Sequence, residues 1–216
     1  MFMMPRAGKN TSRQLGENAT SSSAWRIISR GKGNRTQTKA GGDQNGANQR
    51  LANYTANTLN QITSRDYPGT NDVIGVALAT NSVTVNGVPA FHKWEYYWGT
   101  VSTNNTSSAE WEQVAVSSGG STSTGGLYVP QTREQFAYDL DGNLLSDGRW
   151  SYTWDAENRL VAMTNKTGVG PLYGLAFAYD ALGRRIQKTV TTNGTSFTTL
   201  NFVYDGWNPI AILNPI

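Results

Sequence analysis

A short unit recurs along this 216-residue chain: an aromatic residue, any residue, a second aromatic residue, Asp, two free positions, and then Gly or Asn. Its four clear copies begin at Phe136, Tyr152, Phe177 and Phe202. Aromatic residues at positions i and i+2 lie on one face of a strand. Asp accepts hydrogen bonds from backbone N–H groups ahead of it, and Gly or Asn supplies the left-handed conformation that reverses the chain. Each unit therefore predicts a β-hairpin with an aromatic face.

The turn residues of these units form the structural site that the sequence predicts. They are four pairs: Asp139 with Gly142, Asp155 with Asn158, Asp180 with Gly183, and Asp205 with Asn208. Successive Asp residues are 16, 25 and 25 positions apart, which is a spacing typical of repeat architectures. Because a lone hairpin is marginally stable in water, we expect the units to pair edge to edge into a strip of twisted antiparallel sheet.

An eroded copy of the unit begins at Tyr54, with Asn57 in place of Asp and Asn60 in place of Gly. Asn tolerates positive φ and makes the local turn hydrogen bond, so these substitutions preserve the turn. Residues 72–117 differ from the unit. Alternating Val residues lead into Asn86-Gly87, which is a strong hairpin signal. We therefore expect a small β-sandwich-like module inserted between hairpin units.

The aromatic residues of the inserted module are open to two interpretations. Exposed aromatic rings stack on sugars, so five residues are candidates for glycan binding: Trp94, Tyr96, Tyr97, Trp98 and Trp111. The other interpretation, which we favour, is that Trp94, Tyr96 and Trp98 share one face of a strand and form the core of the module.

The composition agrees with short strands and many turns, because Gly, Ser, Thr and Asn are abundant and only 15% of residues are charged. The chain is predicted to be all-β. We divide it into a disordered N-terminal segment (1–24), degenerate hairpin units (25–71), the inserted β module (72–117), a flexible Gly/Ser-rich linker (118–133) and the clear hairpin units (134–216).

The sequence offers little for catalysis. There is no Cys, and His92 is the single His, without a neighbouring nucleophile motif. Glu95, Glu110, Glu112 and Glu134 supply carboxylates, but nothing in their spacing indicates the opposed pair of a glycosidase. Residues 1–50 hold nine Lys or Arg against two acidic residues, yet no aromatic or Arg-rich recognition motif accompanies this charge. We predict no enzyme activity, no metal, no cofactor and no nucleic-acid partner.

The run Tyr179-Asp180-Ala181-Leu182-Gly183-Arg184 resembles the YD repeat of the RHS family, and Gly33-Asn34-Arg35-Thr36 is a phrase that the family also uses. The resemblance covers roughly residues 26–66 and 134–213 and is more specific over the second block. Residues 72–117 resemble the small β modules inserted in some bacterial RHS proteins. The chain is identified as a fragment or truncated member of a bacterial RHS repeat protein.

This resemblance implies a β-sheet wound into a shell, which in that family encloses a C-terminal toxin, and a secreted or cell-surface location. The chain would then be a non-enzymatic structural segment, and its partners would be the remaining repeats of a larger protein. The alternative is a carbohydrate-binding or adhesion module that acts through the aromatics of the insert, with a glycan or a cell surface as partner. No membrane-spanning segment and no signal peptide is recognisable.

Overall fold

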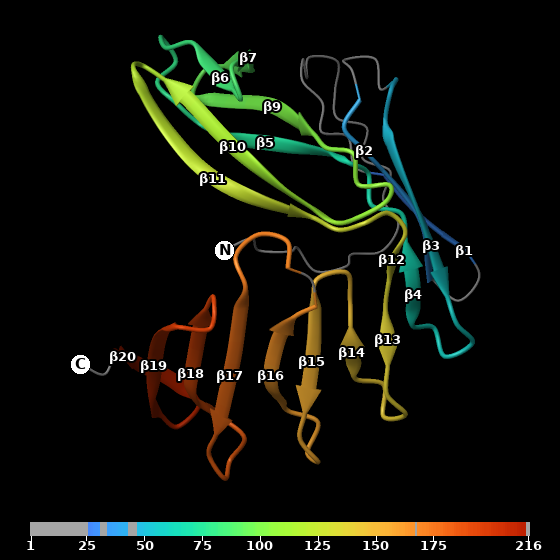
Figure 1. Cartoon of the computed structure of the whole chain (residues 1–216), viewed down its shortest axis with the longest axis vertical. Helices are drawn as coiled ribbons and strands as arrows, with labels where there is room; N and C mark the ends of the chain where they lie inside the picture. The colour runs from blue at the N-terminus through green and yellow to red at the C-terminus, as the bar shows by residue number, and fades with distance from the viewer. Residues whose placement is uncertain (1–25, 31–33, 43–46, 167, 215–216) are drawn as a thin grey trace.

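The computed structural model describes residues 26–30, 34–42, 47–166 and 168–214 (Figure 1). The fold is all-β, as predicted, with 61% strand, several antiparallel sheets and no helix among these residues. The part of the chain that the structure describes therefore has no helix long and apolar enough to cross a membrane. The segment 1–24, which we expected to be disordered, lies outside the described residues.

A five-stranded antiparallel sheet begins the described chain, in the order β1-β2-β3-β4-β12. Its strands are β1 (Arg26–Arg30), β2 (Asn34–Ala40), β3 (Arg50–Ala56), β4 (Ile62–Arg65) and β12 (Glu134–Gln135). The last strand is distant in sequence, since the whole inserted module separates β4 from β12. The chain thus leaves the sheet after β4 and returns beside it.

An eight-stranded antiparallel meander follows, in which consecutive strands are neighbours. Its strands are β13 (Ala137–Tyr138), β14 (Leu144–Ser146), β15 (Trp150–Trp154), β16 (Leu160–Asn165), β17 (Tyr173–Tyr179), β18 (Arg185–Thr192), β19 (Ser196–Asp205) and β20 (Asn208–Leu213). The hairpin turns that join β13 to β14, β15 to β16 and β17 to β18 all lie at the same end of the strands, at the bottom of Figure 1.

The two sheets form one continuous strip, although a module of some sixty residues interrupts the sequence between them. The backbone N–H of Phe136, between β12 and β13, donates to the carbonyl of Thr63 in β4. The hydroxyl of Tyr138 donates to the carbonyl of Ile62 at 3.0 Å. The hairpin unit around Asn57 and the unit around Asp139 are therefore spatial neighbours, as consecutive units would be.

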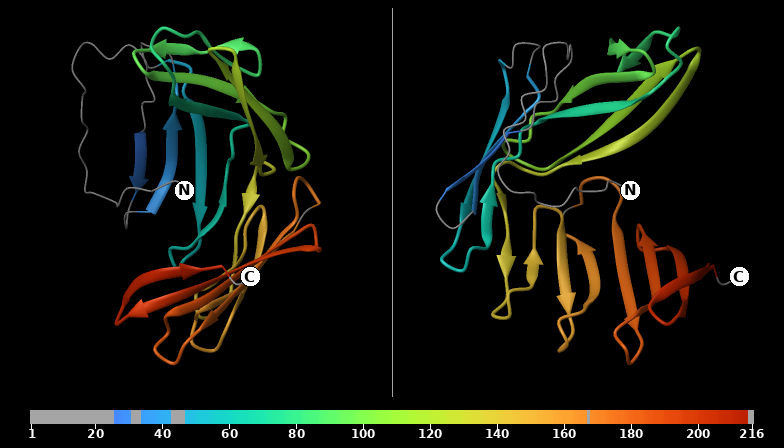
Figure 2. Two further views of the ribbon diagram at one scale, coloured as in Figure 1. Left: turned by 90° about the vertical axis from the view of Figure 1, so that its left-hand side faces the viewer. Right: turned by 180° about the vertical axis from the view of Figure 1, so that it is seen from behind.

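The inserted module contains two sheets. The three-stranded sheet, ordered β5-β9-β8, consists of β5 (Thr70–Val76), β9 (Tyr96–Ser102) and β8 (Phe91–Lys93). The four-stranded sheet, ordered β11-β10-β6-β7, consists of β11 (Ser121–Val129), β10 (Glu110–Ser118), β6 (Val83–Val85) and β7 (Val88–Pro89). Figure 2 shows the module on the side of the strip opposite to the hairpin turns.

The buried core lies almost entirely in and around this module. Val83, Val85, Val101 and Val129 are each at most 5% exposed. The two module sheets come together where Gly99 faces Val85, because a Cβ at Gly99 would lie only 2.7 Å from a methyl carbon of Val85. In contrast, no described residue of the eight-stranded sheet is among the buried hydrophobic residues.

The segment 118–133 is not the flexible linker that its composition suggested. Residues Ser121–Val129 form β11, which pairs with β10 over nine consecutive positions. Gly119 and Gly120, both with positive φ, make the tight turn between these strands. Main-chain pairing with β10, together with buried Val129, holds a Gly/Ser/Thr-rich sequence in a strand despite its low intrinsic propensity.

Candidate functional site

The hairpin turns have a common construction, which Asp180 illustrates. Its carboxylate accepts hydrogen bonds from the backbone N–H groups of Leu182 and Arg184, both at 2.9 Å. The guanidinium of Arg184 donates to the second carboxylate oxygen at 2.7 Å. Gly183 has φ +79° and donates its N–H to the carbonyl of residue 180. The carboxylate thus fixes a turn in which the backbone reverses through the left-handed region.

The same geometry recurs in three further units. Asp139 and Asp155 accept the backbone N–H four residues later, and Asn57 does so with its amide oxygen. The left-handed residues at these turns are Asn60, Gly142 and Asn158. Asn57 shows that the neutral amide can replace the carboxylate in the turn.

Neighbouring units are joined by their second aromatic residue. Trp154 donates its indole N–H to the carbonyl of Leu144 at 2.8 Å, and the Tyr179 hydroxyl donates to the carbonyl of Leu160 at 2.8 Å. Tyr138 and Tyr204 make the equivalent bonds to Ile62 and Arg185. In every case the acceptor lies five residues after the turn Asp or Asn of the preceding unit. The same side-chain hydrogen bond therefore joins each of these hairpins to the preceding one.

The copy around Asp205 is built differently from the sequence prediction. Asp205 pairs directly with Asn208, so the loop contains only Gly206 and Trp207. The left-handed residue is Gly206, with φ +57°, and not Asn208, which begins β20. A glycine directly after Asp allows this two-residue loop, which is shorter than the other turns.

The turn carboxylates are stabilised in their ionised form. For Asp155 the backbone N–H of Arg159 is the largest cause of a lowered pKa, with the Arg159 guanidinium adding to it. For Asp180, desolvation works to raise the pKa, but the hydrogen bonds from Arg184 outweigh it and leave the pKa below the ordinary value of 3.8. These groups hold their turns as carboxylates at neutral pH, with their oxygens already engaged.

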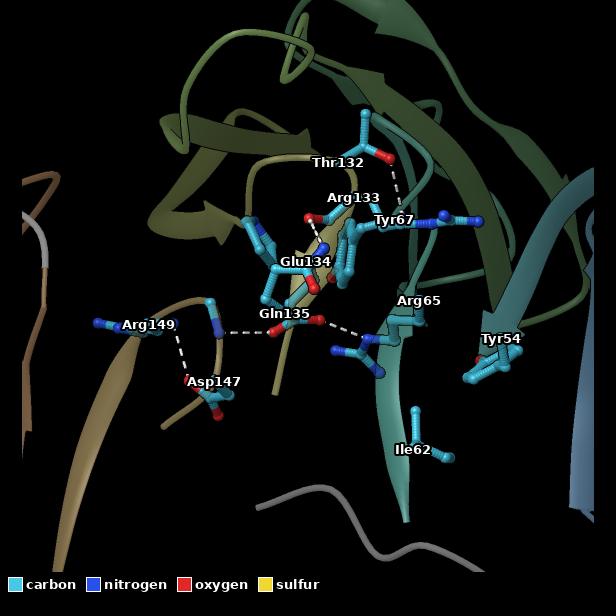
Figure 3. Close-up of polar contacts among 12 residues, drawn as sticks. Tyr54, Ile62, Arg65, Tyr67, Thr132, Arg133, Glu134, Gln135, Asp147 and Arg149 are labelled. Atoms are coloured by element: carbon cyan, nitrogen blue, oxygen red, sulfur yellow. Dashed lines mark hydrogen bonds and ion pairs between the residues drawn. The ribbon is translucent and has the colours of Figure 1, made fainter. Parts of the chain in front are cut away.

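A second polar site lies where the module, the five-stranded sheet and the eight-stranded sheet meet; we call it the seam. Its centre is Glu134 in β12, which is 4% exposed. One carboxylate oxygen forms an ion pair with Arg65 of β4, and the other accepts the backbone N–H of Gly148 at 3.1 Å. Figure 3 shows Arg65 on one side of Glu134 and the segment with Asp147 and Arg149 on the other. Glu134 therefore links both sheets.

The turn between β14 and β15 continues the seam. Asp147 accepts the backbone N–H groups of Arg149 and Trp150, and the Tyr152 hydroxyl donates to it at 2.7 Å. Burial and this hydrogen bond raise the pKa of Tyr152. The Tyr128 hydroxyl, from the module, donates to the carbonyl of Gly148 at 2.7 Å. The module is thereby attached to the same turn that Glu134 holds.

The seam is suited to holding strands together and not to proton transfer. Both carboxylate oxygens of Glu134 already have donors, and its partner Arg65 lies over the rings of Tyr67 and Phe136. A general base needs an oxygen free to meet a substrate proton. Among the described residues there is also no group of three or more His, Cys, Asp or Glu side chains that could hold a metal ion.

The five aromatic candidates of the module do not form one surface. Trp94, expected in a strand, is the first residue of the two-residue turn between β8 and β9, with φ +55°. Tyr96 is 59% exposed, so it lies outside the core that we had favoured for it. Trp98 is on the same outer face and donates its indole N–H to Asp72 at 3.0 Å. The valines, which are smaller, fill the space between the module sheets.

The remaining two candidates point elsewhere. Tyr97 lies on the opposite face of β9 from Tyr96, and its phenol ring packs over Gly75. Trp111 is wedged between Gly126 of β11 and Gly170 in the loop before β17, since a Cβ at either glycine would lie within 2.3 Å of its ring. Trp111 is thus a contact between the module and the eight-stranded sheet.

The single His92 lies in β8, where its Nδ1 is 2.9 Å from the carbonyl of Asn81. Its Nε2 is buried and has no hydrogen-bond partner. One nitrogen of this imidazole is hydrogen-bonded to the main chain and the other is shielded from solvent. An imidazole in this position is poorly placed for catalysis.

Sequence reasoning missed the seam. Arg65 and Glu134 are 69 residues apart, and neither belongs to the repeated unit. Glu134 was noted only as one of four possible carboxylates for glycoside hydrolysis. The available signal was the position of both residues beside a hairpin unit, on the two sides of the insertion.

No family model matches the chain. The chain is 47% identical over 73 residues to the tRNA3(Ser)-specific nuclease WapA of Bacillus spizizenii. It is 45% identical over 73 residues to the tRNA nuclease WapA of Bacillus subtilis and to the tRNA(Glu)-specific nuclease WapA of Bacillus subtilis subsp. natto. Each match covers 34% of this chain and 3% of the relative, so the chain spans only a small part of the relatives' length.

These comparisons correct the identification made from the hairpin units. The relatives are named tRNA nucleases WapA, and this overturns the interpretation as a fragment of an RHS repeat scaffold. The prediction that the chain is a non-enzymatic structural segment was also wrong, because the relatives' names are those of enzymes. The turn unit indicates how the chain folds back, and a fold alone does not determine function.

Two further predictions are corrected by the same relatives. The alternative of a carbohydrate-binding or adhesion module is not supported, because the names refer to tRNA and not to glycans. The expectation of no nucleic-acid partner was wrong for the same reason. Aromatic side chains that suit a sugar ring also suit a nucleobase, so the residue types alone could not separate these partners.

Proposed function

We propose that this chain acts as part of a tRNA nuclease of the WapA type, with tRNA as its substrate. The observation that carries the proposal is the identity of 45–47% over 73 residues to three proteins with that name.

The described residues support a role in holding the substrate. The turn carboxylates and Glu134 accept hydrogen bonds from backbone N–H groups, so these carboxylates are poorly suited to transfer protons. An antiparallel sheet that carries aromatic and basic side chains is a surface on which proteins bind RNA. These side chains would hold the tRNA, and cleavage of that tRNA is the activity that the proposal predicts for the chain.

The test is to incubate the purified chain with total bacterial RNA and to separate the products on a denaturing gel. We expect loss of tRNA, with discrete fragments, while ribosomal RNA stays intact. Heat-denatured chain serves as the control for a contaminating ribonuclease. Intact tRNA at a stoichiometric concentration of folded chain would overturn the proposal.

A further inference from the structure

The eight-stranded sheet has one aromatic face. Six aromatic residues of the hairpin units define it, and we refer to these as the aromatic face: Tyr152, Trp154, Phe177, Tyr179, Phe202 and Tyr204. They lie on β15, β17 and β19, and they alternate with residues that point to the other side. All six are half-buried, and none belongs to a buried core. Each of the six residues therefore keeps part of its surface accessible to solvent.

The opposite face of the sheet has a different character. Most of its cross-strand pairs join small or polar residues, including Thr153 with Ala162 and Thr189 with Thr199. The Thr189 and Thr199 hydroxyls are 3.3 Å apart. The opposite face carries one aromatic residue in these strands, Phe197, which pairs with Thr191 and is 69% exposed. The aromatic residues of the hairpin units themselves lie on the aromatic face.

Two tyrosine rings of the aromatic face are held in place before any ligand arrives. The Tyr179 hydroxyl donates to the carbonyl of Leu160, and the Tyr204 hydroxyl donates to the carbonyl of Arg185 at 2.9 Å. A ring that is tethered at its far end to a neighbouring strand lies across the sheet. Such rings lose little conformational entropy when a flat ligand stacks on them.

Several cations lie on this face, because the guanidinium groups of Arg159 and Arg184 lie over the Tyr179 and Tyr204 rings and two further cations accompany them. Lys188 pairs across the strands with Phe177, and Arg185 pairs with Tyr179, so both point to the aromatic side. The Arg185 guanidinium lies 4.3 Å from the centre of the Phe177 ring. Within the described part of the chain, neither residue forms a salt bridge. The neighbouring Arg159 and Arg184 are, in contrast, paired with Asp155 and Asp180.

We propose that the aromatic face binds a single-stranded segment of RNA, with bases stacked on its rings and phosphates neutralised by Arg185 and Lys188. This inference rests on the proposed function and names the surface that serves it. Proteins bind single-stranded RNA by combining a basic groove with aromatic rings and Arg guanidinium planes on which bases stack. The loops and the 3′ end of tRNA supply such single-stranded segments.

Charge favours this occupant over a second copy of the chain. No Asp or Glu occupies the strand positions of the aromatic face on β15 to β19, whereas two unpaired cations do. A second copy would bring the same cations toward each other, which disfavours association. A single-stranded RNA matches both the cations and the aromatic rings of this face, because it carries negative phosphates and flat bases.

The experiment measures fluorescence anisotropy of labelled bulk tRNA and of a labelled single-stranded oligouridylate, with the full chain at low and physiological ionic strength. The variants are Arg185→Gln and Lys188→Gln. The matched control is Gln187→Glu, which lies between them on β18 but points to the other face, where it pairs with Ala178 and Asn201. Lys188→Gln and Gln187→Glu change the net charge by the same amount.

We expect each cation variant to raise the Kd for both RNAs by about fivefold to tenfold at low salt, and Gln187→Glu to raise it less than about twofold. The slope of log Kd against log salt should fall by about 0.7 for each lost phosphate contact with the single strand. An equal loss in Gln187→Glu, or no binding by the parent chain, would overturn the inference. So would sedimentation showing a dimer that Phe177→Asp dissociates, since a second copy would then occupy the face.

The tRNA cleavage assay separates this inference from the proposed function. If the parent chain cleaves tRNA and the cation variants bind and cleave equally well, the aromatic face is not the RNA surface. If the parent chain binds RNA through these cations and leaves tRNA intact, the inference stands and the proposed nuclease function fails.

Discussion

The inserted module and the eight-stranded sheet are both antiparallel β structures, but different interactions hold them together. The module has a small buried core of valines, with Val129 fully buried and Val85 1% exposed. The described part of the eight-stranded sheet has no buried hydrophobic residue, and it depends on ladder hydrogen bonds, tethered aromatic rings and repeated turns. Hydrophobic burial thus stabilises one region, and local polar geometry repeated along the chain stabilises the other.

The seam is where the two regions depend on each other. Glu134, 4% exposed, receives donors from β4 and from the β14–β15 turn, and Tyr128 attaches the module to that turn. A change at the seam should therefore affect both regions, while a change within either region should stay local.

The largest effect is expected from Arg65→Met, because it leaves the Glu134 carboxylate buried without its cation. Removing one partner of a buried ion pair costs about 3 kcal/mol of the free energy of unfolding. Urea denaturation followed by tryptophan fluorescence measures the loss. Arg133→Met is the matched control, because the Arg133 side chain is 51% exposed and its pair with Asp66 should contribute less than about 1 kcal/mol. Equal losses in the two variants would contradict the role of the seam.

A smaller and local effect is expected from Val129→Ala. Deleting two buried carbons from a fully buried side chain should cost about 2 kcal/mol, including the cavity. Hydrogen exchange resolved by peptide should increase in β10 and β11 and remain unchanged in β17 to β19. Val203→Ala, at a 39% exposed position of the eight-stranded sheet, should cost less than half as much. A loss in Val203→Ala equal to that of Val129→Ala would mean that the sheet has a hidden core.

The contrast between the two regions also explains what the sequence could predict. The turns at Asp139, Asp155 and Asp180 are local, so their residues and spacing contain the information that specifies them. The copy at Asp205 differed because Gly206 directly after the Asp permits a shorter loop. Gly206 stands where the other three units have Leu140, Ala156 and Ala181, so a single residue difference accompanies the change in the turn.

The non-local features could not be read in the same way. Strand β11 has a linker-like composition, and its pairing with β10 becomes visible only in the structure. The seam joins Arg65 to a residue 69 positions away. The aromatic run Trp94 to Trp98 predicted a core, but Trp94 occupies a turn and Tyr96 faces solvent. Tertiary pairing determined these outcomes, and propensity did not.

Tyr128→Phe tests the attachment of the module by a single hydrogen bond. The variant removes the donor to the Gly148 carbonyl and should cost about 1 kcal/mol, because Tyr128 is only 8% exposed. Chemical denaturation measures the loss. Tyr204→Phe removes an equivalent bond from a residue that is only half-buried, where water can replace the donor more readily, and should cost less. A larger loss in Tyr204→Phe would contradict the view that burial sets the strength of these bonds.

The smallest effect concerns acid, and it distinguishes the turns that use Asp from the turn that uses Asn. The pKa values of Asp155 and Asp180 are lowered in the folded chain, so the stabilisation by their carboxylates is present above the ordinary value of 3.8. It is lost as the pH falls through the lower folded pKa. The turn at Asn57 has no group that titrates there, although its amide oxygen accepts the same backbone N–H groups.

Amide exchange measured by NMR between pH 5 and pH 2, corrected for intrinsic rates, should show the Asp180 turn losing protection while the Asn57 turn keeps it. The variant Asp180→Asn should retain the turn, as Asn57 does, but lose the bond from the Arg184 guanidinium. It should therefore be slightly less stable than the parent at neutral pH and show a smaller acid loss. If Asp180→Asn keeps the full acid dependence at this turn, then the carboxylate is not the group whose protonation opens it.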